Sequence, residues 1–251
     1  MAKTWKVAIA GANGRMGAEA VKAVENAEDL ELVATLGSTA DLKEMVESGT
    51  EILVDLTVPT ATERNVRFAV ENGIHAVVGT TGWDGNRLHN LRTLLTQHPQ
   101  VGVLIAPNFA IGAILATEFA AQAAPYFESA EVIEMHHPHK VDAPSGTATH
   151  TAQRIAEARA KAGLAVPPDA TQTDEGGSRG ADIDGVKVHA VRLRGLTASQ
   201  EILLGDEGQQ LVIRHDSFDR VSFMPGVLLG IRKVAEHPGL THGLDGYMNL
   251  R

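Results

Sequence analysis

The sequence contains no cysteine, which excludes disulfide bonds and metal sites built on thiolates. It also lacks any apolar run as long as a membrane span, so we expect no membrane association. The opening residues, Met1 to Lys6, run directly into an apolar strand pattern and contain no apolar region of a secretory signal. Together these absences predict a cytoplasmic protein.

Basic residues are in the minority. The chain has 22 lysines and arginines against 31 aspartates and glutamates, a formal charge of −9 over 251 residues. A nucleic-acid-binding protein is expected to carry a basic patch, so this balance argues against a nucleic-acid partner. An anionic ligand must therefore be met by a local concentration of positive groups.

A glycine-rich turn lies near the start of the sequence. An apolar strand pattern over residues 6–10 runs into Gly11, Gly14 and Gly17, spaced G-x-x-G-x-x-G, and a helical pattern follows to about residue 26. A strand, a glycine turn and a helix let the backbone approach a pyrophosphate and direct a helix N-terminus at it. The arrangement predicts dinucleotide binding, although such turns also occur for packing reasons alone.

The end of the next expected strand, residues 30–36, reads Leu36-Gly37-Ser38 and carries no carboxylate. An acidic residue here would take the ribose 2′-hydroxyl of NAD. Arg15 lies in the glycine turn and could face the 2′-phosphate of NADPH, or it could be a solvated residue of the first helical turn. NADPH and NADH therefore both stay open as cofactors.

Short apolar strands alternate with amphipathic helices through the first part of the chain. We expect strands at 52–56, 75–78 and 101–105, with helices at 61–72 and 84–97. This rhythm predicts an α/β domain with a Rossmann-type, doubly wound parallel sheet, whose ligands bind at the carboxyl ends of the strands. Two of these ends read Gly79-Thr80-Thr81-Gly82 and Ala106-Pro107-Asn108-Phe109.

The rhythm changes after residue 107. A helix at 111–124, a strand at 130–135, a helix at 147–162 and a long mobile loop at 163–182 precede strands at 186–194, 199–204 and 210–216. We expect these three strands to form an antiparallel meander in an α+β domain with a mixed or antiparallel sheet. The predicted division is residues 1–107 with 217–251 for dinucleotide binding, and 108–216 for substrate binding and oligomerisation.

A dense group of proton-transfer side chains follows the strand pattern at 130–135. It consists of His136, His137, His139 and Lys140. Imidazole groups titrate near neutrality, and a lysine can donate a proton or hold a carboxylate. Three close histidines could also bind zinc, but the absence of cysteine and the interleaved Pro138 argue for no metal.

A helix is expected to begin beside this group. Ser145 is placed to cap it, and the backbone N–H groups of Gly146 and Thr147 could bind a carboxylate. The pattern predicts an anion site with acid catalysts at its edge.

The stretch from Glu134 to Thr147, with the N-terminal Gly11-Ala-Asn-Gly-Arg-Met-Gly17, Gly79-Thr-Thr and Ala106-Pro-Asn-Phe, resembles the 4-hydroxy-tetrahydrodipicolinate reductase family, also called dihydrodipicolinate reductase. The resemblance covers essentially the whole chain. It implies reduction of a small cyclic dicarboxylate by NADPH or NADH, with loss of water, in lysine and diaminopimelate biosynthesis. It also implies a homotetramer joined through the second-domain sheets and a C-terminal segment that completes the nucleotide domain.

The resemblance assigns roles to residues. His136 corresponds to the proton donor/acceptor and Lys140 to a second proton donor. Groups that hold the substrate carboxylates correspond to His137, Lys140, Ser145, Gly146 and Thr147. The cofactor contacts correspond to Gly11, Ala12, Asn13, Gly14, Arg15, Met16, Gly79, Thr80, Thr81, Ala106, Pro107, Asn108 and Phe109. Some members carry an acidic residue where Gly37 stands.

Two alternatives stay open. The first is a reductase of the same two-domain build that acts on another small imine or keto acid. The second is a dinucleotide-binding sensor without catalysis. The intact pair of His136 and Lys140 argues against the sensor, which has no need of proton donors.

Overall fold

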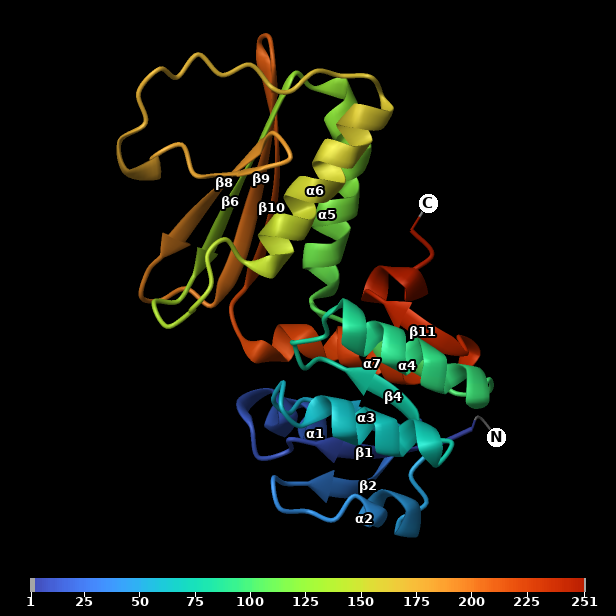
Figure 1. The fold of residues 1–251 in the computed structure, drawn as a ribbon. Coiled ribbons are helices and arrows are strands. Elements are labelled where there is room, and N and C mark those ends of the chain that lie inside the picture. Colours follow the sequence, from blue (N-terminus) through green and yellow to red (C-terminus); the bar gives the residue numbers. More distant parts are fainter. Residues whose placement is uncertain (1–2, 251) are drawn as a thin grey trace. The chain divides into compact units, whose positions relative to one another are not determined.

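The computed structural model describes residues 3–250, which form two compact units (Figure 1). One unit ends at Ala110 and resumes at Arg220, and the other is Ile111–Asp219. The divisions expected after residues 107 and 216 lie close to these boundaries. Within residues 3–250, no helix has the length and apolar character that a membrane crossing requires.

The first unit is built on a six-stranded parallel sheet in the order β11-β5-β4-β3-β1-β2. The strands are β1 (Trp5–Ala10), β2 (Leu30–Leu36), β3 (Ile52–Asp55), β4 (His75–Val78), β5 (Gly102–Ile105) and β11 (Gly239–His242). The four residues of β3 are all buried, as are those of β5, because both faces of a parallel sheet are covered. The Rossmann-type sheet expected from the sequence is confirmed, and β11 is an edge strand that the periodicity did not reveal.

Helices cover the sheet of the first unit. They are α1 (Arg15–Glu25), α2 (Lys43–Glu47), α3 (Thr62–Glu71), α4 (Gly85–Gln97) and α7 (Met224–Lys233), with short 3₁₀ turns η3 (Arg220–Phe223), η4 (Val234–Glu236) and η5 (Leu244–Tyr247). Helix α1 packs against α7, and α3 packs against α4. The guanidinium of Arg232 on α7 forms two hydrogen bonds of 2.8 Å to Asp29, so the C-terminal segment is tied to the N-terminal part of this unit.

The second unit contains a five-stranded mixed sheet in the order β10-β9-β6-β8-β7. Its strands are β6 (Ser129–His136), β7 (Ala181–Ile183), β8 (Val186–Arg192), β9 (Ala198–Asp206) and β10 (Gln209–Ser217). The hairpin of β9 and β10 is present, but the expected three-stranded meander is wrong. Strand β6 lies between β8 and β9, parallel to the first and antiparallel to the second.

The insertion of β6 has a clear physical reason. Its residues Ala130, Val132 and Glu134 are fully or almost fully buried, so β6 belongs at the centre of the sheet. The link from β8 to β9 passes the end of β6, where the Leu193 N–H donates to the His136 carbonyl at 3.0 Å. Strands adjacent in sequence are therefore not adjacent in the sheet.

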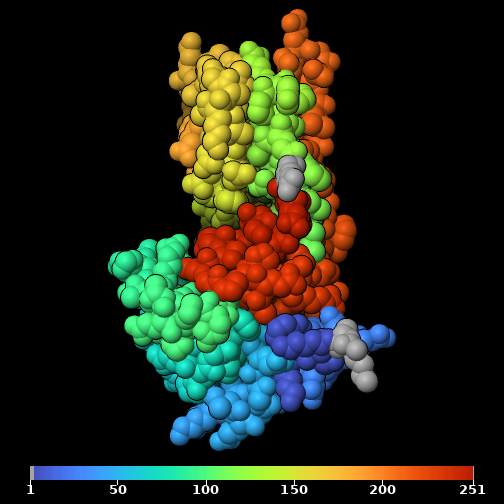
Figure 2. Space-filling view, turned by 90° about the vertical axis from the view of Figure 1, so that its right-hand side faces the viewer, coloured from blue at the N-terminus to red at the C-terminus, as the bar shows by residue number. Residues whose placement is uncertain are grey.

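One face of this sheet is covered by α5 (Ile111–Ala123) and α6 (Gly146–Lys161), which lie side by side (Figure 2). A short 3₁₀ turn, η1 (Ala124–Tyr126), follows α5. Small side chains allow the helices to pack closely on the sheet, and the buried cluster includes Ala116, Ala120, Ala152 and Ile155. The sheet and its two helices form the core of the second unit.

The long loop expected at 163–182 contains the 3₁₀ turn η2 (Glu175–Gly177) and leads into β7. Its C-terminal end is anchored on the sheet by Arg179, which donates to Glu131 on β6 at 2.6 Å. Arg179 also pairs with Asp169 at 3.3 Å within the loop. The anchor fixes one end of the loop against the face of the sheet that α5 and α6 leave uncovered.

A buried arginine joins α6 to the chain that follows α5. The guanidinium of Arg159 donates to the carbonyl oxygens of Ala124, Phe127, Glu128 and Ala165. Burial lowers the pKa of Arg159, because a buried cation loses its hydration. These hydrogen bonds satisfy carbonyl groups that regular structure leaves unpaired.

We expect Arg159→Ala to destabilise the protein by about 3 kcal/mol, since several buried carbonyl groups lose charged donors at once. Arg67→Ala is the control, because Arg67 is exposed and makes a surface ion pair of 3.5 Å with Glu71. The Arg67→Ala substitution should change the free energy of unfolding by less than about 0.5 kcal/mol. The midpoint of urea unfolding measures both, and equal midpoints for the two variants would contradict the role given to Arg159.

Candidate active site

The glycine turn after β1 forms a cradle in which side chains do not fit. Gly11 has a φ of +83°, and a Cβ on it would lie 2.5 Å from the carbonyl oxygen of Leu56. A Cβ on Gly17 would overlap the carbonyl oxygen of Gly11. Gly14 is the N-cap of α1 and offers no side chain to the first-turn N–H groups. The turn thus fits a phosphate group approaching the N-terminus of α1.

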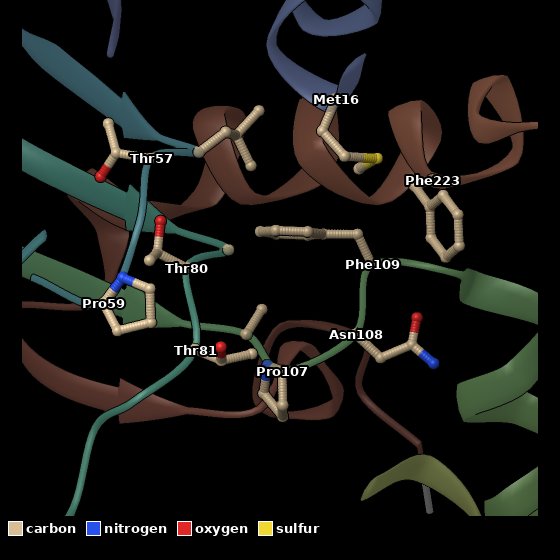
Figure 3. A pocket seen from close by; sticks show the side chains of 12 residues that line it. Met16, Thr57, Pro59, Thr80, Thr81, Pro107, Asn108, Phe109 and Phe223 are labelled. Carbon is tan, nitrogen blue, oxygen red and sulfur yellow. The ribbon is translucent and has the colours of Figure 1, made fainter. Parts of the chain in front are cut away.

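A cavity of about 280 Å³ lies at the carboxyl ends of β3, β4 and β5 (Figure 3). Expected cofactor contacts that line it are Met16, Gly79, Thr80, Thr81, Ala106, Pro107, Asn108 and Phe109. Further lining residues are Leu56, Thr57, Pro59 and Phe223. The other expected contacts, from Gly11 to Arg15, precede Met16 in the turn, and Arg15 is exposed on the first turn of α1. The position matches the ligand-binding edge of a doubly wound sheet.

Gly79 and Phe109 are matched in shape within this cavity. A Cβ on Gly79 would lie 2.7 Å from the Phe109 ring and 2.7 Å from Leu56. In Figure 3 the Phe109 ring points toward the loop that carries Thr80. A larger residue at position 79 would therefore displace the ring or the leucine.

Beneath the cavity, the fully buried carboxylate of Asp55 connects the ends of β3 and β4. It accepts hydrogen bonds from the hydroxyls of Thr57 and Thr80, at 2.8 and 2.7 Å, and from the Asn65 amide at 2.8 Å. Sequence reasoning did not select Asp55. The available signal was a carboxylate placed directly after the apolar run Ile52–Val54.

In the second unit, β6 carries a buried carboxylate two residues before its last residue, His136. Glu134 is fully buried, and its two oxygens meet four nitrogen atoms. His136 Nδ1 lies at 2.6 Å, the Ser145 N–H donates at 3.0 Å, and Arg192 donates through Nη1 and Nη2 at 2.7 and 2.8 Å. Glu134 therefore connects β6, β8 and the start of α6.

These contacts perturb the titration of the pair. Burial alone would raise the pKa of Glu134, but hydrogen bonds from Arg192 and His136 outweigh it and hold the pKa below its usual value. Burial lowers the pKa of His136, while Glu134 favours its charged form and the charges of Lys140 and Arg192 oppose it. A half-buried histidine with a lowered pKa, next to charged partners, is typical of an acid–base site.

The loop after β6 returns toward Arg192. Lys140 Nζ lies 2.6 Å from Asp142 Oδ1, and Arg192 Nη2 donates to the Asp142 carbonyl at 2.7 Å. The hydrogen bond from Lys140 holds the pKa of Asp142 below its usual value. Arg192 thus supports both the carboxylate that contacts His136 and the loop that carries Lys140.

The expected helix cap is confirmed. Ser145 caps α6, and its side chain accepts from the Ala148 N–H at 3.2 Å. Gly146 is the first residue of α6, and a Cβ on it would meet nothing within 4 Å. The N–H groups of Gly146 and Thr147 begin this helix beside His136 and Lys140, where a carboxylate would be favoured.

His137 is the remaining expected substrate contact. Its Nδ1 is buried and has no hydrogen-bond partner among residues 3–250. Its ring lies 6.3 Å from that of the exposed His139, at an interplanar angle of 40°. Across residues 3–250, no group of three or more His, Cys, Asp or Glu side chains is placed to hold a metal ion.

Sequence reasoning selected His136 and Lys140 but not Arg192, Asp142 or the partner role of Glu134. Arg192 lies 58 residues from Glu134 in the chain. Nothing local to Arg192 indicates its partner, whereas the register of β6 and β8 places it opposite His136.

Comparison with known proteins gives two family models that meet near residue 110, where the first unit gives way to the second. The family model described as "Dihydrodipicolinate reductase, N-terminus" matches residues 5–109, and "Dihydrodipicolinate reductase, C-terminus" matches residues 112–247. The 4-hydroxy-tetrahydrodipicolinate reductase of Streptomyces avermitilis is 60% identical over 245 residues, covering 98% of each chain. That of Mycobacterium marinum is 55% identical over 246 residues, covering 98% of this chain and 100% of its own.

Comparison with solved structures points to the same family. A dihydrodipicolinate reductase from Paenisporosarcina sp. TG-14, with dipicolinate bound, superposes with a TM-score of 0.86 at 39% identity, covering 97% of this chain and 99% of that one. A myo-inositol 2-dehydrogenase from Lactobacillus plantarum, at 11% identity and a TM-score of 0.63, shares the fold alone. The resemblance seen in the sequence is confirmed: the chain is an oxidoreductase with a Rossmann-type domain, and it belongs to the dihydrodipicolinate reductase family.

Proposed function

We propose that the protein reduces 4-hydroxy-tetrahydrodipicolinate to tetrahydrodipicolinate, with loss of water, in lysine and diaminopimelate biosynthesis. NADPH or NADH is the hydride donor. The observation that carries the proposal is the group at the end of β6, where His136, Lys140 and the start of α6 share the support of Glu134 and Arg192. The close relatives named for this reaction support the same substrate. A cytoplasmic location is part of the proposal, since a chain without cysteine fits a reducing compartment.

The first unit is proposed to hold the cofactor. The turn from Gly11 to Arg15 fits the pyrophosphate, and the cavity at the ends of β3, β4 and β5 fits the flat nicotinamide end. When bound, the cofactor supplies a hydride. Asp55 keeps Thr57 and Thr80 in place at the edge of this cavity, so the residues that would contact the cofactor are already ordered.

The second unit is proposed to hold the two substrate carboxylates. The N–H groups of Gly146 and Thr147, the Lys140 ammonium and the unsatisfied Nδ1 of His137 supply donors to them. The related enzyme from Paenisporosarcina binds dipicolinate, a planar ring dicarboxylate, which supports this assignment. An acidic protein concentrates its cations here because the ligand is doubly negative.

His136 and Lys140 are proposed to supply protons. Reduction at C4 of the conjugated imine pushes electron density toward C3 of the ring, so an acid must deliver a proton there. A cationic surrounding lowers the barrier by stabilising the negative charge that develops. The sensor alternative does not account for an imidazole held in this way by a buried carboxylate.

We also propose a homotetramer joined through the sheet of the second unit. The face opposite α5 and α6 presents apolar side chains, among them Val191 and Val212, which are 37% and 44% exposed. Leu203 pairs with Val212 in register and points to the same face. Exposed apolar side chains on a sheet face that no helix covers are typical of a subunit contact.

The reaction itself is tested by following NADPH oxidation with freshly generated 4-hydroxy-tetrahydrodipicolinate, and then NADH oxidation. We expect oxidation that depends on this substrate, because the site combines a dicarboxylate cradle with acid catalysts. The ratio of the two rates gives the cofactor preference. A protein that binds both cofactors and oxidises neither with this substrate would favour another imine substrate or the sensor.

Lys140→Ala should lower kcat by about a hundredfold or more, since a proton donor and a carboxylate contact are lost together. NADPH affinity, measured by fluorescence titration, should stay near the wild-type value because Lys140 belongs to the other unit. Lys161→Ala, at an exposed lysine in the last turn of α6, is the control and should leave both values unchanged. Weaker NADPH binding with normal kcat in Lys140→Ala would contradict the proposed role.

The tetramer predicts a solution mass of four times 26.6 kDa by light scattering. Val212→Asp should reduce this mass, because charges placed on an apolar contact must be desolvated. Phe119→Asp is the control: this side chain is 51% exposed on α5, outside the sheet, and its charge should leave the mass unchanged. A monomeric wild-type protein would refute the assembly and leave the reductase proposal standing.

A further inference from the structure

Glu134 and His136 lie on the same side of β6. They are two residues apart on one strand, and side chains at this spacing share a face of the sheet. Glu134 is fully buried, while the His136 side chain is 16% exposed at the end of the strand. The carboxylate therefore lies behind the imidazole and leaves the far side of the ring, with Nε2, free of this contact.

The distance between the two groups assigns the imidazole proton. His136 Nδ1 lies 2.6 Å from Glu134 Oε2, which is a hydrogen bond of charge-assisted length. An ionised carboxylate can only accept, so Nδ1 must carry the hydrogen. The neutral ring then has its lone pair on Nε2, and the protonated ring carries an acidic N–H there.

The arginine on β8 keeps the carboxylate ionised. Arg192 donates to both Glu134 oxygens, at 2.7 and 2.8 Å, and the Ser145 N–H donates a further hydrogen bond to Oε1. Three donors other than His136 would be lost or weakened if Glu134 took a proton. A carboxylate held in this way stays ionised at neutral pH and does not take the proton from the imidazole.

We propose that Glu134 is a positioning residue of the reaction: with Arg192 behind it, its carboxylate fixes His136 in the tautomer protonated at Nδ1 and reserves Nε2 for proton transfer to the substrate. This inference rests on the proposed function of His136. Glu134 does not itself touch the substrate, since its carboxylate is fully buried.

The charged groups around His136 set the sign of the pH dependence. Glu134 on β6 favours the imidazolium, whereas Arg192 on β8 and Lys140 in the following loop oppose it, and Lys140 is itself paired with Asp142. Strand β9 brings Ala198, which carries no charge, opposite His136. Proton donation by His136 is therefore present below its pKa and lost as the pH rises through it. Removing the charge of Glu134 lowers that pKa, so the loss moves to lower pH.

The tautomer is measured directly in the wild-type protein, without substrate or cofactor. Two-bond ¹H–¹⁵N spectra of protein labelled at histidine distinguish rings protonated at Nδ1 from those protonated at Nε2. The signals of His136 are identified by their disappearance in His136→Gln. We expect the Nδ1-protonated form, and an Nε2-protonated His136 would overturn the inference whatever the enzyme's activity.

The variant Glu134→Gln keeps the shape of the side chain and removes its charge. In a plot of kcat against pH, we expect the high-pH limb to shift to lower pH by about one unit or more, as is typical for the loss of an adjacent opposite charge. Above the pKa this shift lowers kcat roughly tenfold. The substrate KM should change less than kcat, because the glutamine oxygen can still accept from the Ser145 N–H and so hold the start of α6.

Glu118→Gln is the matched control. Glu118 on α5 also accepts two hydrogen bonds from an arginine, Arg154, at 3.1 and 3.2 Å, but it is not among the contacts of His136. Its pH profile should match that of the wild type. An unchanged high-pH limb in a folded Glu134→Gln protein would overturn the inference. An inactive wild-type protein would instead refute the proposed function, which separates the two failures.

Discussion

A carboxylate buried as completely as that of Glu134 needs partners, because removal from water strongly destabilises an unpaired charge. Arg192 supplies the compensating charge, and the remaining lone pairs accept from His136 and Ser145. Strand β6, strand β8 and the start of α6 are thereby held at one point. Losing either member of the ion pair would leave an uncompensated charge inside the second unit, so the positions of His136 and of the start of α6 depend on it.

The first unit also contains a buried carboxylate whose charge is stabilised by hydrogen bonds. Asp55 is a buried carboxylate at the end of β3. Its Oδ1 accepts hydrogen bonds from the hydroxyls of Thr57 and Thr80, which lie on neighbouring loops. Parallel strands bring their carboxyl ends to one edge, but the loops beyond those ends need their own anchors. In both units a carboxylate at or near the end of an apolar strand orders the polar groups around it. These polar groups are consequently ordered by contacts within the chain itself.

Much of the architecture could be predicted from the sequence, because local patterns specify it. Continuous apolar runs such as residues 52–54 identify strands buried on both faces, and the glycine turn identifies the start of a Rossmann-type sheet. Ser145 revealed the start of α6 by its capping chemistry. Strand order in the second sheet could not be predicted in this way. Periodicity marks β8 and β9 as strands, but only the burial of β6 decides that it lies between them.

The sequence by itself determined the chemical content of the candidate site: the imidazole of His136, the ammonium group of Lys140, a capped helix beside them, and no cysteine. The tertiary structure decided what those groups can do. It joined Glu134 to Arg192 across 58 residues, and through that pair it fixed the partner of the His136 ring and supported the loop that carries Lys140. Such pairings depend on strand register and burial, which are set by the packing of distant segments and leave no periodic trace in the chain.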